Sequence, residues 1–349
     1  MLKPEPNAHS INHSVTQAPG HPGEAARRVR PLFDAMVRHN ALIMFAVLFV
    51  ASTLLSDSFM SRGNLNDLLR QLTPLLLVSI GMLVVINTGG IDLSVGSIAG
   101  AGGLAVAMLM PVMPSDGPLG LVCAVALSML LGAAFGAVSG ILVAFCGIAP
   151  FIATLALMTI ARGATFMMSN GQSIPMPYGG KAGAIMDAFG SGTMPWLGLP
   201  WPVVLSIVAI ALFWFITSAT VFGRMVIATG SNEQAVRLAG ISEQKYKFAV
   251  YAISGALAGL AGVVSTSRTG VGTPITGVGL ELDAIAACVI GGALLSGGKG
   301  TVINTIIGVL VLGLIGNVMN LLSVPLYPQQ IIKGVIIVFA VLLQRFGAR

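Results

Sequence analysis

The sequence predicts an all-α polytopic membrane protein. Of its 349 residues, 55% are hydrophobic and 9% are charged, and the mean hydropathy is +0.92. An ordinary soluble domain carries roughly a quarter charged residues, which cover its surface. The apolar residues form continuous runs, whereas the strands of a membrane β-barrel alternate. The composition therefore excludes a soluble enzyme, a disordered chain and a nucleic-acid-binding protein, although the net charge is +6.

The first 38 residues differ from the rest of the chain. They are polar, rich in Pro, Gly, Ala and His, and end in a run of basic residues: Arg27, Arg28, Arg30 and Arg38. Such a composition cannot bury an apolar core, so we expect residues 1–38 to be a disordered cytoplasmic tail. All four histidines lie in or next to this tail, which leaves none in the membrane for metal binding or proton transfer. Residues 39–349 are expected to form one transmembrane domain.

A helix that spans a bilayer needs about 20 mostly apolar residues. About ten stretches approach this length, and glycines and prolines weaken the boundaries between the second and third and around the eighth. The stretches are residues 40–57, 68–88, 91–110, 118–144, 149–168, 198–218, 247–267, 282–297, 301–321 and 328–345. Glycines at helical spacing, Gly132, Gly136 and Gly140 in one stretch and Gly255 and Gly259 in another, predict that the backbones of these helices approach other helices closely.

Basic residues indicate the orientation. If the N-terminus is cytoplasmic and ten spans alternate, most Lys and Arg residues near the spans fall inside, among them Arg224, Arg237, Lys245 and Lys247. Fewer fall outside: Arg62, Arg70, Lys181 and Arg268. Cytoplasmic loops carry such an excess of basic residues. The bias predicts that both termini are cytoplasmic.

Few ionisable residues lie at membrane depth, where each one is costly. Asp92 is either a pathway or gate residue, or a helix cap together with Ser94. We expect Arg162 to bind an acid or helix-end carbonyls, and Lys333 to extend towards the interface. This scarcity argues against a proton-coupled carrier. The segment 296–300 lacks the spacing of an ATP-binding loop, so energy for uphill transport would come from another subunit.

Neutral polar residues in or beside the spans suit a neutral, hydroxyl-rich solute, because hydroxyl and amide groups bind such solutes by hydrogen bonds. Each of them is also suited to helix–helix hydrogen bonding. The candidate pathway or gate residues are Asn87, Asp92, Ser94, Phe151, Thr154, Asn317 and Asn320.

The longest cytoplasmic loop, about residues 219–247, is expected to carry a short helix. Ser231 or Asn232 can cap it, Glu233 favours its first turn, and Gly240 can end it. A short rigid helix outside the membrane suits contact with an energy-supplying partner; a helix lying at the membrane interface without a partner is the alternative. The candidate partner-contact residues are Asn232, Glu233, Arg237, Leu238 and Gly240.

Four motifs, in order along the chain, resemble those of ribose-type monosaccharide ABC transporter permeases. They are Gly90-Ile91-Asp92-Leu93-Ser94-Val95-Gly96-Ser97; Phe151-Ile152-Ala153-Thr154-Leu155 with Arg162-Gly163; Asn232-Glu233 with Arg237-Leu238-Ala239-Gly240-Ile241; and Glu281-Leu282-Asp283-Ala284-Ile285-Ala286-Ala287 with Gly291-Gly292 and Gly297-Gly298-Lys299-Gly300. The resemblance covers about residues 56–345. Segments 89–97 and 291–299 also resemble each other weakly.

The resemblance implies a multi-pass subunit of the bacterial inner membrane with the type II, vitamin-B12-importer-like helix arrangement. It implies a second permease subunit, identical or not, cytoplasmic ABC ATPases that bind ATP and Mg, and a periplasmic sugar-binding protein. This chain itself would hold no cofactor and catalyse no reaction. It would import a neutral pentose or hexose by alternating access.

Two other classes of protein remain as alternatives. A stand-alone secondary sugar carrier or facilitator of ten helices would need no ATPase. A membrane scaffold would assemble a transporter without carrying solute itself. The short cytoplasmic helix and the family motifs argue against both.

Overall fold

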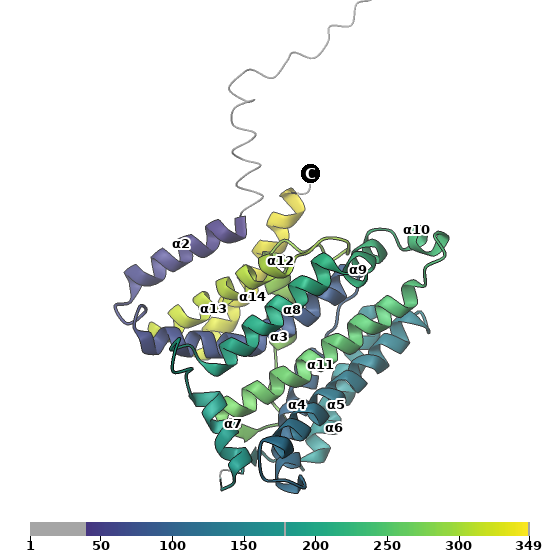
Figure 1. Ribbon diagram of the computed structural model, residues 1–349. Coiled ribbons are helices and arrows are strands. Elements are labelled where there is room, and N and C mark those ends of the chain that lie inside the picture. Colours follow the sequence, from purple (N-terminus) through teal and green to yellow (C-terminus); the bar gives the residue numbers. More distant parts are fainter. Residues whose placement is uncertain (1–39, 178, 348–349) are drawn as a thin grey trace, which may run out of the picture. The chain divides into compact units, whose positions relative to one another are not determined.

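The computed structural model describes residues 40–177 and 179–347, which form helices joined by loops (Figure 1). The predicted tail, residues 1–38, lies outside the described residues. The chain divides after Asn40, and its second unit begins at Ala41. The helices are α2 (Asn40–Leu55), α3 (Arg62–Asn87), α4 (Val95–Leu109) with the short 3₁₀ turn η1 (Met110–Val112), α5 (Pro118–Ala144), α6 (Pro150–Met168), α7 (Lys181–Ser191), α8 (Trp201–Ala219), α9 (Val221–Ser231), α10 (Glu233–Leu238), α11 (Glu243–Thr269), α12 (Leu280–Ile290), α13 (Val302–Leu321) and α14 (Leu326–Gly347).

Within residues 40–177 and 179–347, seven helices are long and apolar enough to cross a membrane. They are α3, α4 with η1, α5, α6, α8, α11 and α13. Each coincides with a predicted apolar stretch, so the prediction of a polytopic helical membrane protein is confirmed. Two further predicted stretches form α2, a shorter apolar helix, and α14. The remaining stretch, 282–297, is interrupted.

The predicted eighth span, 282–297, is wrong as a single helix. Helix α12 ends at Ile290, and the chain continues as a loop to Thr301. Gly292, Gly297 and Gly298 adopt φ of +86°, +93° and +74°, which residues with side chains rarely adopt. Gly292 follows the end of the helix directly, and Gly297 and Gly298 lie in the loop that comes after it. The predicted start of the third span at 91 also differs from the structure. Residues 88–94 are not helical, and α4 begins at Val95, four residues later.

Helix α11 is central to the packing, and Figure 1 shows it beside α4 and α5. Gly132 and Gly136 on α5 face Gly255 and Tyr251 on α11 so closely that a Cβ on either α5 glycine would overlap the α11 backbone. Gly102 on α4 approaches Gly259 in the same way. The glycine-mediated packing predicted from spacing is therefore confirmed.

The irregular segments 88–94 and 291–300 meet beside the end of α3. The backbone N–H of Gly298 donates to the Asn87 carbonyl over 3.0 Å, and Asn87 Nδ2 donates to the Gly300 carbonyl over 3.3 Å. Gly230, near the end of α9, packs against both Asn87 and Gly298. The weakly similar glycine-rich segments thus lie against each other. The short strands β1 (Ile174–Pro175) and β2 (Val271–Gly272) pair in antiparallel fashion elsewhere.

Candidate functional site

The predicted short helix is α10, and its caps follow from the sequence. Asn232, rather than Ser231, is the N-cap, because its Oδ1 accepts a hydrogen bond of 2.9 Å from the N–H of Ala235. Gly240 follows the helix with φ of +77°. The surrounding segment differs from the prediction of a loop at 219–247, since it also contains α9, capped by the Thr220 hydroxyl, and the first turn of α11.

A network of four charges joins α10 to α11. Arg237 donates to Glu243 Oε1 from Nε over 3.0 Å and from Nη2 over 2.6 Å. Lys247 Nζ lies 2.7 Å from Glu233 Oε2. Hydrogen bonding to Glu243 raises the pKa of Arg237 above its ordinary value, so the guanidinium remains charged. The network holds α10 against the first turns of α11.

Sequence reasoning missed Glu243 and Lys247, although their spacing was visible. They lie one turn apart on α11, so both face the same side. The predicted span began at 247, which placed Glu243 in a loop. Glu243 has a nearly buried side chain, 6% exposed, which marks it as part of the protein interior and not of a solvated loop.

Helix α10 presents one apolar side chain outward and one inward. Val236 is buried against the rest of the chain, whereas Leu238 is 88% exposed. A large apolar side chain at the end of an otherwise charged helix is available to contact another protein.

The second predicted site lies in the non-helical segment 88–94 between α3 and α4, which we call the break. Asp92 is completely buried, and its Oδ1 accepts hydrogen bonds from the N–H and hydroxyl of Ser94. Its Oδ2 accepts from the Ser254 hydroxyl on α11 over 3.0 Å. Asp92 thus binds the N–H of Ser94, the residue before α4, but no side chain of the described residues binds the free N–H groups of the first turn of α4. The interpretation of Asp92 or Ser94 as a side-chain cap of this helix is therefore wrong. The Ser254 contact had no signal in the sequence.

Two further hydroxyls hold the residue before Asp92. The carbonyl of Ile91 accepts from Thr154 Oγ1 on α6 over 3.2 Å and from the Tyr251 hydroxyl on α11 over 3.4 Å. Thr154 also donates to the Pro150 carbonyl of its own helix over 2.8 Å. Predicted residues Asp92, Ser94 and Thr154 therefore come together around segment 88–94, with Tyr251 and Ser254 as additional members.

The charged residues inside the packing find partners. Arg162 on α6 donates to the carbonyls of Pro274 and Thr276, so its partners are carbonyls of the turn before α12 and not of a helix end. Lys333 on α14 lies 3.0 Å from Asp283 Oδ2 on α12. Lys333 therefore has a charged partner, which the interpretation from the sequence did not include. The ion pair offsets part of the cost of placing these two partly buried charges among apolar helices.

The other predicted pathway residues make contacts outside this cluster. Asn87 binds the 291–300 loop, and Phe151 is exposed at the start of α6. Asn317 exchanges amide hydrogen bonds of 2.8 and 3.1 Å with Asn64 on α3, and Asn320 accepts one from Gln329 on α14. These last contacts join helices, which is the alternative role considered for such residues.

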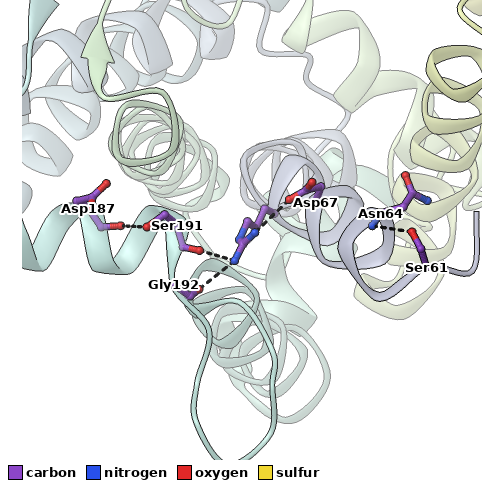
Figure 2. A network of polar contacts seen from close by, with 7 residues as sticks. Ser61, Asn64, Asp67, Asp187, Ser191 and Gly192 are labelled. Carbon is purple, nitrogen blue, oxygen red and sulfur yellow. Dashed lines mark hydrogen bonds and ion pairs between the residues drawn. The ribbon is translucent and has the colours of Figure 1, made fainter. Parts of the chain in front are cut away.

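Figure 2 shows the contacts around Asn64 at the start of α3. The Asn64 N–H donates to the Ser61 hydroxyl over 3.3 Å, which caps α3. Arg70 pairs with Asp67 over 3.1 Å and donates to the carbonyls of Ser191 and Gly192, where α7 ends. A guanidinium at the C-terminal carbonyls of a helix complements its dipole. This network anchors α7 to α3, away from α10.

A cavity of about 580 Å³ lies between the break and α10. Its wall includes Gly89 and Gly90 of the break, Glu233 of α10, and Lys247 and Tyr251 of α11. The two candidate regions therefore share one hollow.

Comparison with known proteins identifies the family. Residues 64–341 match the family described as branched-chain amino acid transport system / permease component. The chain is 39% identical over 307 residues to the ribose import permease protein RbsC of Escherichia coli K12, covering 88% of this chain and 93% of that protein. It is 40% identical over 299 residues to RbsC of Bacillus subtilis, covering 86% and 90%.

A third relative, the L-arabinose ABC transporter permease protein AraH of Azospirillum brasilense, is 35% identical over 321 residues, covering 92% of this chain and 91% of that protein. No solved structure matches the chain. The resemblance drawn from the four motifs is confirmed. The chain therefore belongs to this family of permease components, in which it stands with the ribose-type ABC permeases as a membrane transport subunit and not an enzyme.

Proposed function

We propose that the chain is the permease subunit of an ABC importer that carries a neutral monosaccharide, a pentose or hexose, from periplasm to cytoplasm across the bacterial inner membrane. The observation that carries the proposal is α10, a capped helix held to α11 by ion pairs and presenting Leu238 outward. The family description names amino acids, but the relatives that cover most of the chain are named for ribose and arabinose. Their names favour a sugar.

The helices fit ten crossings with both termini in the cytoplasm. Seven long apolar helices, α2, α14, and one crossing made by the short α12 together with the loop that follows it would give this number within the described residues. Alternating crossings then put the end of α3 and the α9–α10 segment on the cytoplasmic side, and Gly230 does pack against Asn87. Loops 169–200 and 322–325 fall on the periplasmic side, where a sugar-binding protein would dock. This order of crossings is compatible with the type II, vitamin-B12-importer-like arrangement of helices that the family resemblance implies.

A second permease subunit is supported by charges that one chain leaves partly uncovered. The side chains of Asp283 and Lys333 are 24% and 31% exposed, although α12 and α14 lie among apolar helices. Charged groups facing lipid are costly and normally face protein or a water-filled cavity. A second copy against α12 and α14 would remove them from lipid and leave a polar route between the copies.

Energy would come from a cytoplasmic ABC ATPase, which binds ATP and Mg and contacts α10. Its closure would move α10, and the ion pairs of Arg237 and Lys247 would pass the movement to α11. The transporter would then alternate between outward and inward openings. The chain would itself hold no cofactor, and selection of the sugar would rest mainly with the binding protein.

Co-purification tests the proposal. The tagged chain, extracted in mild detergent from its native host, should bring an ATPase with it, and Leu238→Glu should release that ATPase. Leu197→Glu, an exposed position far along the chain from α10, is the control and should retain it. Uptake of labelled D-ribose and L-arabinose, with L-leucine as the comparison, identifies the class of solute.

Two results would contradict the proposal. If the wild-type chain comes without any ATPase under several gentle conditions, and the purified chain alone moves sugar into liposomes, the chain is a stand-alone carrier. If purified assemblies bind the ATPase but take up leucine and neither pentose, the sugar proposal is wrong.

A further inference from the structure

The segment between α11 and α12, residues 270–279, is not helical and packs beside the middle of two apolar helices. A Cβ on Gly100 of α4 would come within 3.3 Å of the Pro274 carbonyl. Gly100 lies nine residues before the end of α4 at Leu109, which is about 14 Å along the helix axis. Arg162 Nη1, six residues before the end of α6, donates to the Thr276 carbonyl over 2.9 Å. The segment therefore reaches membrane depth.

Val278 stands at the tip of a tight turn, residues 273–282, which we call the Val278 turn. Gly277 and Gly279 flank it with φ of +78° and +82°. Gly277 packs against α4 so closely that a Cβ there would overlap the α4 backbone, while the place of a Cβ on Gly279 is open among the described residues. Val278 is 73% exposed, and Ile275 and Leu282 are exposed beside it. The turn thus presents an apolar tip away from the rest of the chain.

Lipid does not suit this surface. Backbone outside helices is tolerated at membrane depth only where it is buried in protein or lines a water-filled cavity. Charged side chains lie on both sides of the Val278 turn: Arg162 of α6 at its start, and the partly exposed pair of Asp283 on α12 and Lys333 on α14 at its end. Charged groups at this depth also face protein or water. The face between α6 and α14 therefore needs a protein partner.

A second copy of this chain is the partner that fits this face. The face is continuous with the surface of α12 and α14, which carries the exposed ion pair. A two-fold axis brings the same surface of each subunit together, so the Val278 turn of one copy meets the Val278 turn of the other. Two apolar tips are complementary to each other without opposite charges. A soluble sugar-binding protein or an ATPase could reach loops outside the bilayer but not a turn at membrane depth.

We propose that two copies of this chain bring their Val278 turns together across a two-fold axis, and that these turns form the constriction that closes the sugar route between the copies. Val278 of each copy lies at its narrowest point. An apolar constriction stops a polar solute because it excludes the water that the solute carries. Separation of the two turns would open the route. The inference rests on the proposed function, since it uses a sugar route between two permease subunits, and it adds the residues that close that route.

Cross-linking of single cysteines tests the contact. In a chain with Cys123, Cys146 and Cys288 replaced, Val278→Cys should form a disulfide-linked dimer when membranes are oxidised with copper phenanthroline, with and without MgATP so that both states are sampled. Ile207→Cys on α8 is the matched control, because Ile207 is also an apolar residue of a spanning segment and is 50% exposed; it should remain monomeric. Oxidation of Val278→Cys should abolish sugar uptake, and a reducing agent should restore it. Absence of the Val278→Cys dimer, or equal dimer from both variants, would overturn the contact.

Enlargement of the constriction tests its closure. Proteoliposomes that contain the whole transporter are loaded with whichever of labelled D-ribose and L-arabinose the wild type takes up. Val278→Ser shortens the apolar tip and makes it polar, so this variant should release sugar several-fold faster than the wild type without ATP or binding protein. Val278→Leu keeps an apolar tip and should remain as tight as the wild type, as should Ile207→Ser on α8.

The two proposals fail in different ways. Retention of the ATPase on purification shows that each variant is folded, which the exposed position of Val278 favours. A tight Val278→Ser transporter that still takes up sugar with ATP would overturn the constriction and leave the importer function standing. Absence of ATP-driven uptake of either sugar by the wild type would instead contradict the importer function.

Discussion

The Ser254 hydroxyl donates a hydrogen bond of 3.0 Å to Asp92 Oδ2, across 162 positions of the sequence. Both residues are completely buried. The bond ties the non-helical start of α4 to the middle of α11, the same helix whose first turns hold α10. The carboxylate of Asp92 therefore binds its neighbour Ser94 and also takes part in tertiary packing against α11.

Substitutions at Asp92 should separate its structural role from a pathway role. Asp92→Asn keeps one carbonyl oxygen for the Ser94 N–H, and the Ser254 hydroxyl can accept from the new amide, so transport should largely persist. Asp92→Leu leaves the Ser94 N–H and two hydroxyls without an acceptor, which costs about 1–3 kcal/mol for each unsatisfied group. Expression and thermal stability in detergent, measured beside uptake, check this. Equal loss of uptake in both variants with normal stability would instead favour direct contact with the solute.

Ser254→Ala offers an independent measurement at the same bond. It removes one donor from a buried carboxylate and leaves both bonds from Ser94 in place. We expect a loss of stability of about 1–3 kcal/mol. Ser265→Ala, farther along α11, is the control, because Ser265 bonds only to the Ala261 carbonyl of its own helix among the contacts of the described residues. Equal stability of the two variants would show that the Asp92–Ser254 bond contributes little.

Changes at α10 should uncouple ATP hydrolysis from uptake. Glu233→Lys places a positive charge opposite Lys247, and Gly240→Pro cannot adopt the φ of +77° that ends the helix. An exposed ion pair contributes only about 0–1 kcal/mol, so the membrane domain should still assemble. ATPase activity without uptake is the expected result, and Glu233→Gln should be milder. Normal coupled uptake in both Glu233→Lys and Gly240→Pro would contradict the role of α10.

The sequence was sufficient to predict α10, a cap at Ser231 or Asn232, and the glycine face of α5, because each depends on residues within a few positions of one another. The bonds between Asp92 and Ser254 and between Asp283 and Lys333 join residues far apart in the chain, so no local pattern indicates them. The end of α12 at Ile290 was missed for a related reason. The 291–300 loop binds Asn87 and Gly230, and such a tertiary contact overrides the apolar run that predicted a longer helix.

The close approach of α5 and α11 predicts opposite outcomes for two glycine substitutions. In Gly136→Val, the side chain would overlap the Tyr251 carbonyl, so the helices must separate, at a cost typical of overpacked cores, about 1–3 kcal/mol. Gly316 on α13 has open space around its Cβ position, so Gly316→Ala should be neutral or stabilise the helix by up to about 1 kcal/mol. Thermal unfolding in one detergent compares the two. A stable Gly136→Val protein would show that the α5–α11 contact is not tight.

The ion pair between Asp283 on α12 and Lys333 on α14 predicts that the stability of the protein depends on both residues together. Lys333→Ala should destabilise the protein, because it leaves Asp283 as an unpaired carboxylate among apolar helices. Adding Asp283→Asn removes that charge and should recover much of the loss, so the double variant should be more stable than Lys333→Ala alone. Thermal unfolding of the two single variants and the double variant gives the interaction energy. If the effects simply add, Lys333 and Asp283 are solvated independently, and the surface of α12 and α14 does not need a second permease subunit to cover this pair.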